Sequence, residues 1–155
     1  MDFFNLEVPE YIHKSLSRVM TENAIAFEKY SQGRALKNKI STIDDLKNAC
    51  KLFRQSLDLD NNFLQARTFY GACLNQLGKT EEAEEILLSC LDYAEKLDYE
   101  EGLSDIYNQL GIIYWNIKPE KMHEYFQKGL DIQIKHDNKQ AQAKYLNNLS
   151  YYYIN

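Results

Sequence analysis

Residues 69–91, FYGACLNQLGKTEEAEEILLSCL, contain two helical patterns separated by a short turn. On both sides of Gly78, apolar residues recur at intervals of three or four, the spacing of a single helix face. Gly78 stands where a helix end favours a left-handed residue, and Thr80 is a suitable N-cap. Glu81 and Glu82 place negative charge at the positive end of the second helix. Two apolar stripes beside a short turn must face each other, so this stretch predicts an antiparallel helical hairpin.

Similar patterns extend from this hairpin toward both ends of the chain. Pro9 and Glu10 suit the start of a short capping helix, and another helix is expected over about 22–37. Ser41 or Thr42, each followed three residues later by an aspartate, resembles a capping box for the next helix. The residues expected to face inward include Ile25, Ala26 and Leu36 near the start, Leu103 to Ile117 in the clearest helix, and Ala143, Leu146, Leu149 and Tyr153 in the last helix.

Composition limits the classes of protein to which the chain can belong. Its 155 residues match one domain, and its six glycines and two prolines favour helix over strand or disorder, so the predicted fold class is all-α. A formal net charge of −5 argues against nonspecific binding to nucleic acid or to an anionic membrane, because both need a basic surface. The same charge favours a basic partner.

The cysteines and the N-terminal sequence indicate a cytoplasmic protein. Cys50, Cys73 and Cys90 are widely spaced and lie on or beside apolar stripes, so they are predicted to be reduced core residues. The first twenty residues lack a basic start followed by an apolar run, and no segment reaches the roughly 18 uninterrupted apolar residues that span a bilayer. We therefore expect neither export nor a membrane span.

A repeat with a period of about forty residues runs through the chain. Gly33, Gly71, Gly111 and Ser150 occupy equivalent positions, and the spacing between successive members is nearly constant. The predicted organisation is a tail and capping helix over 1–21, followed by a repeat domain over 22–155. Its units are expected at about 22–60, 61–99 and 100–137, with a half-repeat at 138–155.

These repeats resemble the tetratricopeptide pattern of W-x2-L-G-x2-Y, then A-x3-F, then P. In the best unit Gly71 and Ala83 match the pattern, while Leu87 replaces its Phe. Small residues at these points allow paired helices to approach closely. The resemblance covers about residues 25–155 and implies antiparallel helical hairpins stacked in a right-handed α-solenoid of about seven or eight helices. A HEAT-like repeat has a compatible period, but its motif fits less well.

The spacing between units changes after the first one. The interval from Phe53 to Arg67 is shorter than the corresponding intervals that begin at Leu87 and at Phe126. The difference is about six residues, which add about 9 Å if they are helical. This is similar to the longer-helix repeats of kinesin light chains and many bacterial regulatory proteins. The segment AFEKYSQGR is similar to repeats attached to bacterial class III nucleotide cyclases, which implies a part of a larger bacterial regulatory protein.

No catalytic residue, cofactor or metal site is expected. His13, His123 and His136 lack metal-ligand spacing and are interpreted as surface or capping residues. The glutamates within 81–85 are interpreted as a solvated helix face. The Gly-Lys-Thr at 78–80 lacks the upstream glycine and strand of a phosphate-binding loop.

The tetratricopeptide resemblance also implies a peptide-binding groove, because the first helix of each unit lines the concave face of such stacks. The residues that it assigns to this groove are Tyr30, Arg34, Thr68, Asn75, Asn108, Ile112, Trp115, Asn116, Asn147 and Tyr151.

Within this set, Thr68, Asn108 and Asn147 are expected to form a polar ladder. Carboxamides offer a donor and an acceptor together, so a ladder of this kind suits an extended peptide backbone. Trp115 is a candidate anchor, since tryptophan gives a large contact area with a polar handle. The plainer interpretation is that these polar side chains only solvate a concave surface. The two-carboxylate clamp of chaperone-binding repeats is not expected, because Ala72 and Asp105 lie among the corresponding positions.

Three functional hypotheses follow. The first is a noncatalytic scaffold that binds a protein or peptide in the concave groove. The second is a self-association module that uses the apolar C-terminal helix and its residues Tyr151 to Ile154. The third is a regulatory enzyme with a site that no residue of the sequence indicates.

Overall fold

The computed structural model describes residues 20–154 and contains seven α-helices and no strand within that range. The helices are α2 (Ala24–Lys37), α3 (Ile43–Leu59), α4 (Leu64–Gln76), α5 (Thr80–Lys96), α6 (Glu100–Tyr114), α7 (Pro119–Lys135) and α8 (Lys139–Ile154). The all-α prediction is confirmed. The predicted tail and capping helix at 1–21 lie almost entirely outside the described residues.

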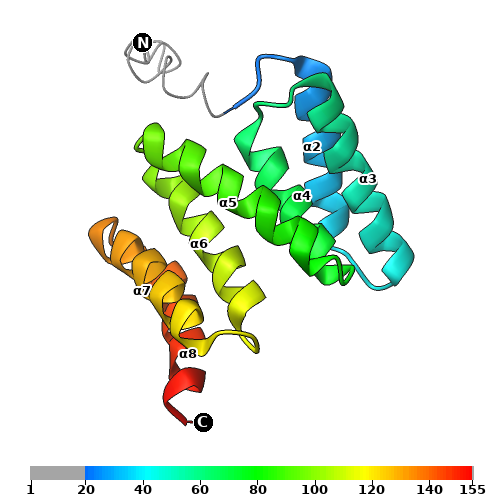
Figure 1. Cartoon of the computed structure of the whole chain (residues 1–155). Helices are drawn as coiled ribbons and strands as arrows, with labels where there is room; N and C mark the ends of the chain where they lie inside the picture. Colours follow the sequence, from blue (N-terminus) through cyan, green and yellow to red (C-terminus); the bar gives the residue numbers. More distant parts are fainter. Residues whose placement is uncertain (1–19, 155) are drawn as a thin grey trace, which may run out of the picture.

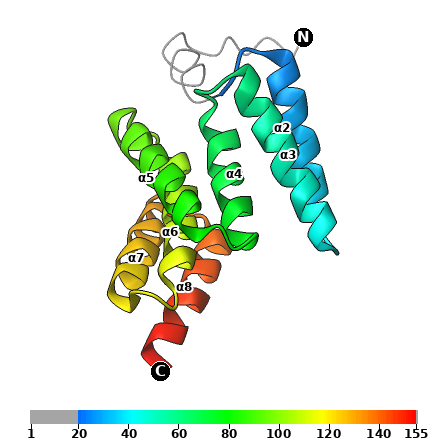
Figure 2. The same ribbon diagram turned by 45° about the vertical axis from the view of Figure 1, so that its right-hand side comes forward.

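The helices form antiparallel hairpins that stack side by side, as Figure 1 shows. The pairs are α2 with α3, α4 with α5, and α6 with α7. Successive hairpins meet where α3 packs on α4 and α5 on α6, while α8 packs on α7 and α4 also contacts α6. Figure 2 shows the stack running from α2 at one end to α8 at the other. The chain is therefore an α-solenoid of stacked helical hairpins.

Each hairpin is closed by a glycine that lies against a large side chain of the opposite helix. An added Cβ would lie 2.9 Å from Phe53 at Gly33 and 3.0 Å from Leu87 at Gly71, and closer still to Phe126 at Gly111. Most Cβ contacts are longer, so a side chain at Gly33 or Gly111 would force the opposite ring to shift, and one at Gly71 would press on Leu87. The role that the repeat pattern predicts for its small residues is confirmed.

The turn between α4 and α5 confirms one sequence prediction and corrects another. Gly78 has a φ of 81°, and the Lys79 N–H donates to the Leu74 carbonyl oxygen at 2.9 Å, which closes the end of α4. Thr80 is not the N-cap, because α5 begins at this residue and Lys79 precedes it without a side-chain capping bond. The Thr80 hydroxyl instead donates to Asn75 Oδ1 at 3.2 Å, which ties the two helices together across the turn.

The predicted capping box at the start of α3 is confirmed. Thr42 Oγ1 accepts from the Asp45 N–H at 3.1 Å, and Asp45 Oδ2 accepts from the Thr42 N–H at 3.0 Å. Hydrogen bonds, the largest of them from the Ser41 N–H, lower the pKa of Asp45. The carboxylate therefore stays ionised at the positive end of α3.

The longer helices predicted for the second and third units are present. α3 ends six residues after Phe53, whereas α5 and α7 each end nine residues after their equivalent positions, Leu87 and Phe126. α4 begins seven residues before Gly71, whereas α6 begins eleven residues before Gly111. The added residues therefore lengthen both helices at these junctions by about one turn each.

The predicted inward face of α8 is wrong. Of its four residues only Leu149 is buried, and the others are exposed: Ala143, Leu146 and Tyr153. Tyr145 takes the central place, because Gly129 of α7 leaves room for its ring, and an added Cβ at Gly129 would overlap Tyr145 Cζ. The large ring that fills this space sets the rotation of α8.

Two isoleucines also depart from the predicted inward faces. Ile25, near the start of α2, is 57% exposed. Ile117 is 57% exposed as well, because α6 ends at Tyr114 and Ile117 lies in the following turn. A helical spacing of apolar residues therefore overestimates the core at helix ends.

The three cysteines are free and buried, which confirms that they pack in the core. Burial raises the pKa of Cys73 and that of Cys90 to about 11. Both thiols therefore stay protonated at neutral pH and act as small apolar side chains.

Candidate functional site

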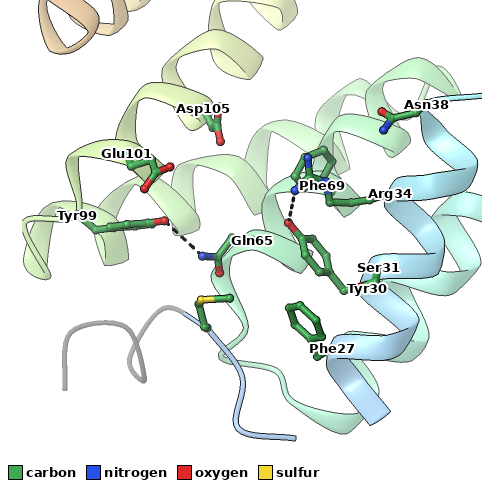
Figure 3. Close-up of a pocket in the computed structure, with 11 residues that line it drawn as sticks. Phe27, Tyr30, Ser31, Arg34, Asn38, Gln65, Phe69, Tyr99, Glu101 and Asp105 are labelled. Atoms are coloured by element: carbon green, nitrogen blue, oxygen red, sulfur yellow. Dashed lines mark hydrogen bonds between the residues drawn. The ribbon is translucent and has the colours of Figure 1, made fainter. Parts of the chain in front are cut away.

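A cleft of about 660 Å³ opens on the face that α2, α4 and α6 share, and we call it the first cleft. Figure 3 shows side chains from these helices and their connections directed toward it. Its lining residues are Met20, Phe27, Tyr30, Ser31, Arg34, Asn38, Gln65, Phe69, Tyr99, Glu101 and Asp105. Since α2, α4 and α6 are the first helices of successive hairpins, the cleft lies on the face where the repeat resemblance predicts a groove.

Aromatic side chains of α2 and α4 form one wall of the first cleft. The buried ring of Tyr30 lies 4.8 Å from that of Phe63 and 5.9 Å from that of Phe69, between centroids. Phe27 continues the wall at 6.1 Å from Tyr30 and is 43% exposed. Burial raises the pKa of Tyr30, so its hydroxyl is neutral and accepts a hydrogen bond from Arg34 Nη1 at 3.4 Å. The wall is a fixed apolar surface with one exposed edge.

Two cations of α2 lie over this aromatic wall. The Arg34 guanidinium is 5.2 Å from the centroid of the Phe69 ring, and Lys37 Nζ is 5.1 Å from the same centroid. Such contacts attract a cation to the ring face. Lys37 is half-buried, and this burial lowers the pKa of its amine. Both cations are thus held against α4.

The opposite wall, on the α6 side, is acidic and polar. Glu101 and Asp105 extend from α6 toward the cleft, and Tyr99 lies across its edge (Figure 3). Gln65 Nε2 donates to the Tyr99 hydroxyl at 3.4 Å, while Gln65 Oε1 is buried and has no hydrogen-bond partner in the described part of the chain. Desolvation between the walls raises the pKa of Asp105. Among residues 20–154, neither Glu101 nor Asp105 has an ion-pair partner within 4 Å.

A second cleft, of about 690 Å³, lies at the C-terminal end of the stack. Its lining residues are Trp115, Asn116, Pro119, Met122, Tyr151 and Tyr152. Trp115 is half-buried, with its ring 5.7 Å from Phe126 and 5.0 Å from Tyr151 between centroids. This cleft is mainly apolar, and its described lining residues include neither a carboxylate nor a basic side chain.

The structure divides the ten predicted groove residues among different places. Tyr30 and Arg34 line the first cleft, whereas Trp115, Asn116 and Tyr151 line the second. The remaining members line neither cleft: Thr68, Asn75, Asn108, Ile112 and Asn147. Half of the predicted groove residues therefore line one of these two clefts, and the other half lie outside both.

The predicted polar ladder is not exposed along its length, which is a correction. Thr68 is 7% exposed, and its hydroxyl donates to the Leu64 carbonyl oxygen of its own helix at 3.0 Å. Asn108 is 3% exposed on α6, which packs against α4, α5 and α7, and its Oδ1 has no hydrogen-bond partner among residues 20–154. Only Asn147 is exposed. A peptide backbone therefore cannot contact all three side chains in this conformation.

The other two predicted groove residues have different surroundings. Asn75 is half-buried and accepts from Thr80, so it serves the turn between α4 and α5. Ile112 is 41% exposed on α6. In the sequence it follows Asp105 of the first cleft and precedes Trp115 of the second cleft. Its exposure leaves it available as an apolar contact.

Three lining residues share a regular spacing, and sequence reasoning assigned none of them to the ten-residue groove, although it placed Asp105 among the positions that correspond to the carboxylate clamp. Phe27, Gln65 and Asp105 each stand six residues before the repeat glycine of their unit. Extending the predicted groove positions by one further helical turn would have found all three. Tyr99 and Glu101 were missed for another reason: they belong to the added turn at the start of α6, which the shorter first unit does not have.

Histidines and acidic residues outside the first cleft have structural contacts. His123 Nε2 lies 2.7 Å from the Tyr153 hydroxyl, and His136 Nε2 lies 2.8 Å from Glu100 Oε2. Within the described range, no group of three or more His, Cys, Asp or Glu side chains is placed to hold a metal ion. In the same range, none of the helices combines the length and the apolar character needed to cross a membrane.

Comparison with known proteins supports the fold. No family model and no curated protein matches this sequence. A solved structure described as "MamA RS-1 ArsTM double mutant" is similar, with a TM-score of 0.53 and 21% sequence identity over 90% of this chain and 80% of that one. MamA is a tetratricopeptide-like helical protein. At this identity the similarity concerns the fold alone, and it agrees with the stacked hairpins described above.

Proposed function

We propose that this chain is a noncatalytic helical-repeat module that binds a protein or peptide segment in the first cleft. The observation that carries the proposal is the pairing, across one opening, of a fixed aromatic wall with carboxylates that have no ion-pair partner among residues 20–154. Protein-binding sites commonly combine aromatic anchors with polar groups of this kind.

The shape and charge of the cleft favour a polypeptide over other ligands. Its walls come from three successive hairpins, so an extended segment lying across them meets several helices at once. Its lining includes both charge signs, and the chain carries a formal net charge of −5, which disfavours phosphate-rich ligands. We propose further that the chain belongs to a larger, cytoplasmic, bacterial regulatory protein, because its longer-helix repeats are similar to those of many such proteins and its cysteines are free.

A peptide-display screen against the whole chain tests this proposal. Phe27→Ala removes an exposed aromatic edge of the first cleft, and Leu88→Ala removes a side chain of similar exposure, 39%, that lines neither cleft. We expect selected peptides to bind the Leu88 variant like the wild type and the Phe27 variant about ten-fold or more weakly. Peptides that bind all three proteins equally would place the binding surface elsewhere. Circular dichroism checks that both variants keep their helicity.

Self-association through the C-terminal end is a second candidate function. Tyr151, Tyr153 and Ile154 are 52%, 71% and 80% exposed beside the second cleft. Exposed apolar side chains that gather in one place mark interaction sites more often than scattered ones do. Light scattering over a wide concentration range distinguishes this candidate: a dimer that a Tyr153→Ser, Ile154→Ser double variant abolishes supports it, and a strictly monomeric wild type contradicts it.

A further inference from the structure

The two halves of the first cleft differ in charge. The α6 side has the carboxylates of Glu101 and Asp105, and within residues 20–154 none of the lining residues on this side is basic. Among the described residues of the lining, the basic one is Arg34, which belongs to α2 and lies over the rings of Tyr30 and Phe69, with its guanidinium 5.8 and 5.2 Å from their centroids. The acidic half is therefore open to an additional cation.

A buried acceptor lies in the same half. Gln65 lines the cleft between the aromatic and acidic walls, and its Nε2 is bonded to the Tyr99 hydroxyl. Its Oε1 is buried and has no partner within the described structure. A buried acceptor without a hydrogen bond is costly, so a ligand that brings an N–H donor gains from pairing with it.

The charges around Asp105 also favour binding of a cation. Desolvation is the largest influence on this carboxyl group and raises its pKa, while Glu101 adds repulsion. Lys144, Arg34 and Lys37 act on it from α8 and α2 without forming an ion pair. Both carboxylates are exposed at the cleft, so a cation can approach them from solvent, and a cation placed between them removes this repulsion.

We propose that the acidic half of the first cleft receives a basic side chain, an arginine or a lysine, from the bound protein segment. The inference rests on the proposed function and adds the chemistry of the partner. Glu101 and Asp105 supply the charge, Gln65 Oε1 accepts an N–H, and the ring of Tyr99 offers a face for the cation. Arginine suits this arrangement well, since its planar guanidinium donates in several directions.

The opposite assignment is an acidic side chain bound to the cations of α2. Arg34 and Lys37 already lie over Phe69, and Lys37 does not line the cleft. An acidic group next to Arg34 also faces Glu101 and Asp105 across the cleft. The observations therefore favour the basic side chain, and the two assignments predict opposite results in one experiment.

The probes are two short peptides, acetyl-Ala-Arg-Ala-amide and acetyl-Ala-Glu-Ala-amide, titrated into the isotope-labelled whole chain by NMR. We expect the arginine peptide to shift the Gln65 side-chain amide saturably and to lower the apparent pKa of Asp105, and the glutamate peptide to do neither. In a Glu101→Gln, Asp105→Asn double variant, binding of the arginine peptide should weaken about five-fold or more. A Glu81→Gln, Glu85→Gln variant removes the same charge from exposed residues of α5 and should bind like the wild type.

Each other outcome overturns the proposal. Equal or tighter binding of the glutamate peptide favours the opposite assignment, and an unchanged affinity in the Glu101, Asp105 variant shows that these carboxylates do not bind the cation. If the arginine peptide binds both double variants more weakly, long-range attraction by the net negative charge explains its binding, and a specific site for the cation does not. The display screen keeps the two proposals separate: selected peptides without a basic residue that still require Phe27 contradict only this inference, whereas selected peptides that ignore Phe27 contradict the proposed function.

Discussion

The junction between α5 and α6 and the junction between α7 and α8 stand one repeat apart in the sequence and have the same backbone course. Asp98 and Asp137 adopt left-handed conformations, with φ values of 51° and 53°. In each junction the following N–H reaches back to a carbonyl oxygen of the preceding helix, from Tyr99 at 3.1 Å and from Asn138 at 3.0 Å. Both helices therefore end in the same hydrogen-bonded motif.

The side chains that follow differ at equivalent positions. Asn138 caps α8, since its Oδ1 accepts from the Ala141 N–H at 3.1 Å. Tyr99 makes no capping bond to α6 and lies in the first cleft instead. Gly102, which replaces alanine at the equivalent position, makes this possible, because an added Cβ would overlap the Tyr99 ring. At the start of α6 the chain therefore lacks the capping hydrogen bond that Asn138 makes at the start of α8, and the equivalent residue, Tyr99, lines the candidate binding site.

The largest expected effect comes from alkaline pH and acts on α8. Burial raises the pKa of Tyr145 to about 12, compared with about 10 for an ordinary tyrosine. Its hydroxyl donates to the Ser104 carbonyl oxygen at 2.5 Å, whereas Ile106 stands at the equivalent position of α6. Because the folded state retains the proton, the contribution of Tyr145 is complete below pH 10 and is lost as pH rises from about 10 to about 12, by about 2–3 kcal/mol.

Urea unfolding of the wild type and Tyr145→Phe from about pH 9 to about pH 12 measures this loss. The variant should be less stable at neutral pH by about 1–2 kcal/mol and should lose less stability above pH 10. Cys73 and Cys90 also titrate in this range and affect both proteins equally. Equal losses in both proteins would show that the Tyr145 hydroxyl titrates like an exposed one.

The second prediction introduces at the start of α6 the asparagine N-cap that Asn138 provides for α8. Tyr99→Asn should stabilise the chain by about 1 kcal/mol, because asparagine is a favoured N-cap and the native residue does not cap α6. The same variant should bind selected peptides about ten-fold more weakly, because it loses a ring of the first cleft. Urea unfolding and peptide titration together measure the two changes. A variant that gains stability and keeps its affinity for the peptides would show that Tyr99 is not part of the binding surface.

The third prediction exchanges the small residues of the junctions. Ala141→Gly should destabilise α8 by about 1 kcal/mol through helix propensity and leave peptide binding unchanged. Gly102→Ala should weaken peptide binding, because the added methyl displaces the Tyr99 ring, while its gain in helix propensity offsets part of the strain. The two variants are matched controls for each other in unfolding and binding measurements. Unchanged peptide affinity in Gly102→Ala would show that the position of the Tyr99 ring does not affect peptide binding.

The sequence predicted the parts of the fold that short-range chemistry determines. The repeat glycines, the turn at Gly78 and the capping box at Thr42 each need a particular residue type, so the residue itself reveals the local structure. The rotation of α8 was not predictable in this way, because it depends on the space that Gly129 leaves for Tyr145 across two helices.

The candidate site was less predictable than the fold. The repeat register placed Tyr30 and Arg34 on the face that has the first cleft, but it also selected Asn108, which is buried. Tyr99 and Glu101 enter the cleft only because α6 has an added turn. Differences between repeats, rather than their common pattern, therefore determine the chemistry of this surface.

The smallest expected effect concerns the residue that the two junctions share. An L-residue in the left-handed region costs about 1 kcal/mol, and glycine avoids this cost but loses more entropy on folding, so Asp98→Gly should stabilise the chain by about 0.5 kcal/mol. Asp137→Gly should gain less, because Asp137 forms an ion pair with Lys139 at 2.7 Å. Urea unfolding at low and high salt separates the two contributions, since salt screens the exposed pair. If Asp98→Gly instead destabilises the chain, the aspartate side chain itself stabilises the turn after α5. That result would contradict the assumption that the left-handed conformation is the main cost at this position.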